Sequence, residues 1–161
     1  MEEAGKSEAP PPGVLTRWVE NVGAAALLVA VATDAIAVAG RHLGFAFLGS
    51  IELFQMTALV ATASALLVTT LAGRHAAVHI LVDRLAPRPR RALLASGYLA
   101  SAAAFLLLFA GSLWVAWDLW PTREMTELLG LPVRWFRLVW IAAAGAIAGL
   151  FLVQFWREIR G

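Results

Sequence analysis

The sequence predicts an all-α membrane protein with four transmembrane helices, and three observations lead to this class. Hydrophobic residues make up 60% of the 161-residue chain and charged residues 15%, whereas soluble globular domains contain roughly 45–50% apolar residues. Four apolar runs reach the roughly 20 residues that a helix needs to cross a bilayer. The seven tryptophans gather near the ends of these runs, as in the aromatic belts of membrane proteins. A soluble protein with a Trp-rich core would not explain runs of this length.

The chain divides into a short tail and one membrane domain. Residues 1–13 are acidic and rich in proline and lack the basic start of a secretory signal, so we expect a disordered tail. Residues 14–161 form the expected four-helix domain. Its spans are predicted at about 16–40, 53–73, 92–117 and 133–156. The third apolar run is the longest, which predicts a helix that is tilted or extends beyond the membrane.

The first span contains Asp34, an acid that costs about 3 kcal/mol at the centre of a span. Arg41 lies two helical turns farther on along the same face. A polar contact between Asp34 and Arg41 near the outer interface is one interpretation. A proton or ion relay through Asp34 is the other.

The second span also starts with an acid. Glu52 follows Ser50, the expected N-cap, and lies in the first turn, where the helix dipole favours an anion. Two roles remain open for Glu52: it stabilises the start of its own helix, or it contacts another subunit.

The connector over residues 73–91 determines the predicted orientation. It holds five of the thirteen Lys and Arg residues. Counted over the whole chain, nine Lys and Arg fall on the side of this connector and four on the other side, which predicts that both termini are cytoplasmic. Within the connector, apolar residues recur at helical spacing and predict an amphipathic segment on the bilayer surface.

No enzyme site or cofactor site emerges from the sequence. His75 and His79 have the spacing of paired metal ligands, but the Glu and the third ligand of a metalloprotease are absent. All three histidines lie outside the spans, where axial haem ligands are not expected. The chain has no cysteine. We therefore expect no catalytic residue, metal or cofactor, and the dispersed basic residues do not form a nucleic-acid surface.

The outer connector and the fourth span contain turn and packing signals. We expect Thr122 to cap a short helical turn that ends at Gly130. Pro132 suits the first turn of the fourth helix, where a missing N–H costs little. Gly145 and Gly149 form a small-xxx-small pattern that permits close approach of another helix.

From residue 17 to residue 160 the order of features resembles the small Q-type (DctQ-like) membrane subunit of TRAP (tripartite ATP-independent periplasmic) transporters. In that family the second span is followed by an Arg, a His-apolar-x-apolar-Asp-x-Leu pattern and a basic stretch. Arg74, His79 to Leu85 with Asp83, and residues 88–91 fill these places.

Two further motifs carry the same resemblance. Glu52 resembles the acid at the start of the family's second span. Thr126 with residues 129–132 resembles a Thr-x-x-Leu-x-Ile-Pro pattern, in which Leu131 replaces the usual Ile.

The resemblance implies a scaffold subunit in the bacterial inner membrane. In that family a large M-type membrane subunit carries the substrate and sodium sites and moves as an elevator. A soluble periplasmic solute-binding protein delivers an organic acid to the pair. The outer connector between the third and fourth spans, from Thr122 to Leu131, is then expected to help receive this protein. The residues expected to serve subunit contacts or structure are Glu52, Arg74, His79, Asp83, Thr126, Pro132, Gly145 and Gly149.

Two other functions remain open. A small homodimeric proton-coupled exporter also has four spans and an acid in its first helix, as Asp34 is here, but such chains lack a long amphipathic connector. A haem-binding membrane redox subunit would require axial ligands inside the spans.

Overall fold

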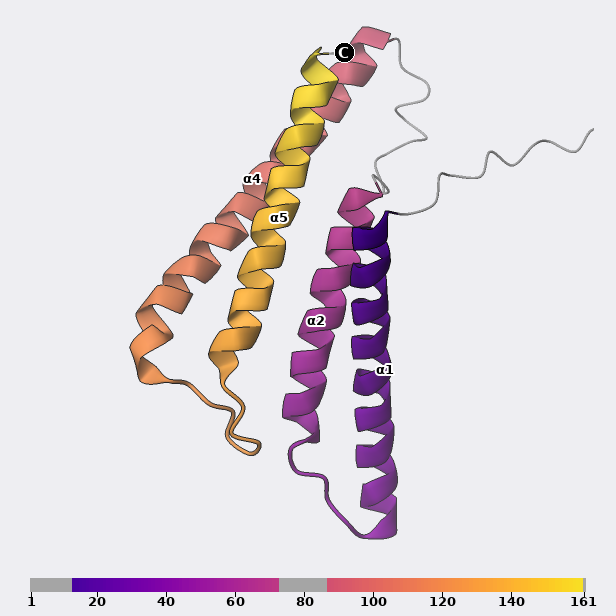
Figure 1. The fold of residues 1–161 in the computed structure, drawn as a ribbon, viewed down its shortest axis with the longest axis vertical. Coiled ribbons are helices and arrows are strands. Elements are labelled where there is room, and N and C mark those ends of the chain that lie inside the picture. Colours follow the sequence, from indigo (N-terminus) through magenta and orange to yellow (C-terminus); the bar gives the residue numbers. More distant parts are fainter. Residues whose placement is uncertain (1–12, 73–86, 161) are drawn as a thin grey trace, which may run out of the picture.

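The computed structural model describes residues 13–72 and 87–160, which are almost entirely helical (Figure 1). Within these ranges four helices are long and apolar enough to cross a membrane. They are α1 (Val14–Leu43), α2 (Ser50–Leu71), α4 (Pro87–Leu119) and α5 (Val133–Arg160). A short 3-10 helix, η1 (Trp120–Thr122), follows α4. The predicted fold class is confirmed.

The helices are longer than the apolar runs that predict them. α4 has 33 residues and therefore measures about 50 Å at 1.5 Å per residue, whereas the hydrocarbon core of a bilayer is about 30 Å thick. The longest expected span thus belongs to the longest described helix. Both ends of α4 carry polar residues because the helix continues past the apolar core.

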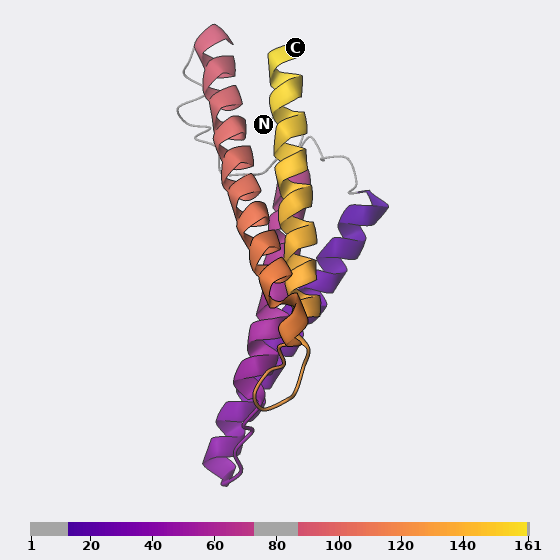
Figure 2. The same cartoon turned by 90° about the vertical axis from the view of Figure 1, so that its left-hand side faces the viewer.

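The four helices form two antiparallel pairs (Figure 1). α1 packs along α2, α4 packs along α5, and the pairs meet where α2 contacts α5. Figure 2 shows that the axes of α1 and α4 are inclined in opposite directions. α1 forms one edge of the molecule, so it has only one large contact surface within the described part of the chain.

The hydrophobic core lies between α2, α4 and α5. Its buried centre consists of Ala102, Ile147 and Phe151, with partly buried side chains around it. The rings of Phe105 and Phe151 lie 5.9 Å apart between centroids. Most apolar side chains of α1 are exposed instead, such as Leu28 at 71%. An exposed apolar surface of this kind is suited to contact with lipid or with another protein.

Two polar contacts join the helices inside this arrangement. The Trp140 indole N–H donates to the Ser112 hydroxyl at 3.1 Å and links α5 to α4. The Gln154 amide donates to the Thr70 carbonyl at 3.0 Å and links α5 to α2. Hydrogen bonds between helices supply specificity where lipid and protein are equally apolar.

α1 ends at Leu43 because the next residue adopts a left-handed conformation. Gly44 has φ 85°, which glycine tolerates without steric cost. The N–H groups of Gly44 and Phe45 both donate to the Gly40 carbonyl. The Phe45 ring lies over Gly40, where a Cβ would be 2.7 Å from a ring carbon.

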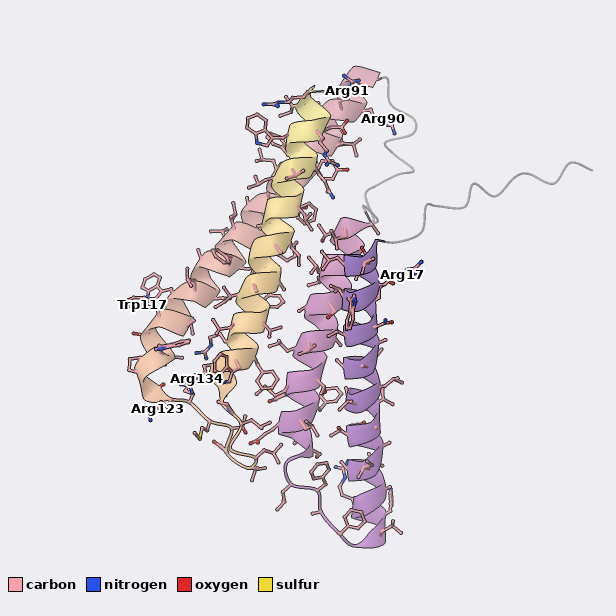
Figure 3. The ribbon with its side chains drawn as sticks, in the orientation of Figure 1. Arg17, Arg90, Arg91, Trp117, Arg123 and Arg134 are labelled. Carbon is pink, nitrogen blue, oxygen red and sulfur yellow. The ribbon has the colours of Figure 1, made fainter. Side chains whose placement is uncertain are left out.

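The arginines labelled in Figure 3 lie near helix ends. Arg17 lies at the start of α1, and Arg90 and Arg91 lie at the start of α4, whereas Arg123 and Arg134 lie where α4 ends and α5 begins. In Figure 1 the start of α1 and the end of α5 both point toward the same side of the molecule.

Candidate functional site

Residues 123–132 belong to the expected outer connector, and we call them the outer loop; they fold back as a small hairpin. The Thr126 N–H donates to the Leu131 carbonyl at 2.9 Å, and the Val133 N–H donates to the Glu124 carbonyl at 3.1 Å. These two bonds flank an antiparallel bridge between Met125 and Pro132. Pro132 occupies a position whose N–H is not needed, which explains why proline is accepted there.

The Thr126 side chain closes this hairpin. Its hydroxyl accepts a hydrogen bond from the Leu131 N–H at 3.0 Å. The Gly130 N–H donates to the Thr126 carbonyl at 3.2 Å, and Gly130 has φ 63°, a conformation that favours glycine. The Thr-x-x-Leu-x-x-Pro pattern is therefore the pattern of one closed turn.

Glu52 attaches α2 to the outer loop. Its two carboxylate oxygens accept hydrogen bonds from the N–H groups of Leu128 at 2.8 Å and Leu129 at 2.9 Å. The Thr126 hydroxyl and the Glu127 N–H also interact with this carboxylate. A cluster of successive N–H groups is a natural receptor for an anion. Glu52 thus lies in the first turn of α2 and also accepts hydrogen bonds from backbone N–H groups of the loop.

The same contact is sealed by packing. A Cβ at Gly49 would lie 2.5 Å from a methyl carbon of Leu129, so Leu129 occupies the space that any larger residue at position 49 would need. The Leu129 side chain therefore packs against the backbone just before α2, and Figure 1 shows the loop at the same level as the start of α2.

An ion pair connects the loop to α5. The Arg137 guanidinium donates a hydrogen bond to the Glu124 carboxylate at 2.9 Å. Within the described ranges these two side chains form the one ion pair. Together, Glu52 and Arg137 hold the loop between α2 and α5. We call the outer loop with Gly49, Glu52 and Arg137 the loop-holding site.

Two details of the expected loop and helix ends are wrong. Gly49, not Ser50, occupies the N-cap of α2, and no side chain caps it. Thr122 belongs to η1 and donates to the Leu119 carbonyl at 2.7 Å, so it does not start a helical turn. The hairpin bonds at Thr126 and Glu124 satisfy the loop backbone instead.

Gly145 and Gly149 have different surroundings. A Cβ at Gly145 would lie 3.1 Å from the Phe109 ring, so this glycine serves the packing of α5 on α4. Gly149 is exposed, and nothing lies within 4 Å of its added Cβ. Half of the small-xxx-small pattern is thus used within the chain and half faces outward.

The expected contact between Asp34 and Arg41 is not formed. Both side chains are exposed, and neither makes a hydrogen bond or ion pair with another residue of the described ranges. Arg74, His75, His79 and Asp83 lie outside the described residues.

Sequence reasoning missed the close crossing of α1 and α2. A Cβ at Gly23 would lie only 2.8 Å from the Ser64 Cβ. Small residues such as Gly23 and Ser64 in two apolar helices are a sequence signal for a close helix crossing. The position of a glycine in α1 does not by itself show which residue of which helix it faces.

The described residues contain a mainly apolar groove and no cluster of metal-ligand side chains. Within 13–72 and 87–160, no group of three or more His, Cys, Asp or Glu residues is placed to hold a metal ion. A groove of about 490 Å³ between α2, α4 and α5 is mainly apolar, with Ser112 and Arg137 among its lining residues.

A scan against protein families matches residues 27–161 to the family described as "Tripartite ATP-independent periplasmic transporters, DctQ component". Searches of curated proteins and of solved structures find no match. The family match covers most of α1 and the whole of the other three helices, so it includes the loop-holding site.

Proposed function

The chain belongs to the DctQ family of tripartite ATP-independent periplasmic transporter components, and from this premise we propose that it is the small scaffold subunit of a sodium-coupled organic-acid importer. A large M-type membrane subunit carries the substrate and sodium sites. A periplasmic solute-binding protein delivers the substrate. This chain supports the large subunit, binds no substrate and catalyses no reaction. The family match over residues 27–161 is the observation that carries the proposal.

The proposal includes an orientation in the bacterial inner membrane. Both termini lie in the cytoplasm, because the basic residues follow the positive-inside rule. Arg17, Arg90 and Arg91 then mark the cytoplasmic end, and the outer loop lies in the periplasm (Figure 3). This orientation presents the loop to a binding protein arriving from the periplasm.

The loop-holding site gives the outer loop a defined shape in this role. Glu52, Thr126 and Pro132 shape the loop and fix it to α2, and a preshaped loop loses less conformational entropy when a partner docks. Glu52 therefore acts through the loop rather than on the substrate. Arg74, His79 and Asp83 anchor the connector at the membrane or at the large subunit.

Deletion of this chain in its native host tests the proposal. The probe is a radiolabelled organic acid chosen by a thermal-shift screen on the associated solute-binding protein. Sodium-dependent uptake should be lost on deletion and restored by a plasmid-borne copy. Full uptake in the deletion strain, with the large subunit present at its normal level, would refute the scaffold role.

A further inference from the structure

Charged side chains recur along one stripe of α1. Glu20, Asp34 and Arg41 lie at seven-residue spacing with Leu27 between the two acids, and all four are exposed. Seven residues are close to two helical turns, so these side chains share one face. In the described part of the chain none of the three charges forms a hydrogen bond or ion pair.

A groove of about 400 Å³ lies where α1 crosses α2, and Glu20 and Leu27 of the stripe are among its lining residues. Small residues line it, including Gly23, Ala61 and Ala65. Ser64 also lines it, is only 8% exposed and makes no hydrogen bond with another described residue. The groove therefore combines room for a close helix approach with the Ser64 hydroxyl, which forms no hydrogen bond within the described residues.

Lipid alone does not satisfy this face. Acyl chains fill an apolar groove, but they offer no donor to a carboxylate, and acids in a span almost always face protein or water. Glu20 and Asp34 are separated by about 21 Å along the helix, so a single headgroup cannot reach both. α2 is the helix that α1 contacts extensively within the described residues. The stripe borders that contact, since Glu20 and Leu27 line the groove between the two helices.

A second copy of the chain is a poor occupant. Two parallel copies related by an axis along the membrane normal present the same residues to each other. Glu20 would face Glu20 and Asp34 would face Asp34, and like charges repel most strongly in a medium of low dielectric constant. The charge pattern favours a partner that presents hydrogen-bond donors or cations beside both Glu20 and Asp34.

We propose that the α1 acidic face, defined as Glu20, Leu27 and Asp34 with the groove at Gly23 and Ser64, binds a transmembrane helix of the large subunit. That helix presents cationic or hydrogen-bond-donating side chains at the levels of Glu20 and Asp34. This inference rests on the proposed function, which supplies the large subunit.

Photocrosslinking from two matched positions tests which face of α1 is covered. Leu27 and Val29 are both exposed, at 57% and 45%, and lie about 200° apart around the helix axis at nearly the same depth. Photoreactive benzoylphenylalanine replaces each residue in turn in the full chain, coexpressed with the large subunit. Irradiation of membranes should give several-fold more heterodimer product from position 27 than from position 29.

Copurification of the large subunit is measured on the same samples, so that the two hypotheses fail separately. If the large subunit does not copurify with the unmodified chain, the proposed function fails. If it copurifies but crosslinks mainly from position 29, or from neither position, the α1 acidic face is not the docking surface. A product from position 27 that consists of two copies of this chain, or of a link within it, also overturns the inference.

Charge reversal provides a second readout. Asp34→Lys should reduce copurification of the large subunit several-fold, because the substitution places a cation against the partner's donors. Asp118→Lys reverses an exposed acid near the outer end of α4 and should leave copurification unchanged. Equal copurification of both variants would contradict the role of Asp34.

Discussion

The crossing of α1 and α2 should not tolerate one additional methyl group at Gly23. In Gly23→Ala the new Cβ would lie 2.8 Å from the Ser64 Cβ, whereas carbon atoms pack at roughly 3.5–4.0 Å. The Ser64 Cβ is fixed to the backbone of α2 and cannot rotate away. The two helices must therefore separate by about 1 Å at this point.

A matched glycine in α4 isolates the cost of this separation. Nothing lies within 4 Å of a Cβ added at Gly97, so Gly97→Ala changes helix propensity without a clash. Overpacking typically costs about 1–3 kcal/mol. Since both variants gain the same propensity term, Gly23→Ala should be less stable than Gly97→Ala by about 1–3 kcal/mol.

Unfolding in mixed micelles measures this difference. The purified full chain is titrated with sodium dodecyl sulfate, and tryptophan fluorescence follows the loss of helix packing. The Gly23→Ala midpoint should fall below that of Gly97→Ala. Equal midpoints would refute the close crossing at Gly23 and Ser64, and with it the shape of the groove on α1.

Three other perturbations test separate contacts. Glu52→Gln should accelerate hydrogen exchange at the Leu128 amide, because a neutral acceptor binds the loop N–H groups less strongly; unchanged exchange would show that the carboxylate does not hold the loop. Gly145→Leu should destabilise the isolated chain, whereas Gly149→Leu should spare it in the same micelle titration, since only the former meets a neighbouring ring. Asp83→Lys should lower the yield of large subunit in an affinity purification of the tagged chain. An unaltered yield would contradict a role of Asp83 in binding the large subunit.

The spans could be predicted because bilayer thickness constrains them directly. An apolar run of the required length leaves few alternatives to a helix, since backbone groups in lipid must bond internally. The helix ends were less predictable. α1 continues to Leu43 because Gly44 and Phe45 close its last turn on Gly40, and hydropathy does not register that closure.

The partner of Glu52 could not be found by local reasoning. The Leu128 N–H lies 76 residues away along the chain, and an acid in a first turn is already explained by the helix dipole. Similarly, the sequence motif that contains Thr126 and Pro132 does not reveal the bridge between Met125 and Pro132. The roles of these residues depend on contacts between segments that are distant in the sequence, and such contacts become visible only when the fold is known.

Native mass spectrometry of the affinity-purified chain tests the central claim most directly. The tagged 17.3 kDa chain is expressed in its native host, extracted in mild detergent and analysed without denaturation. A scaffold subunit should appear in a species that also contains one large, many-span membrane protein. A species made only of copies of this chain would contradict the account and would favour a homo-oligomeric exporter.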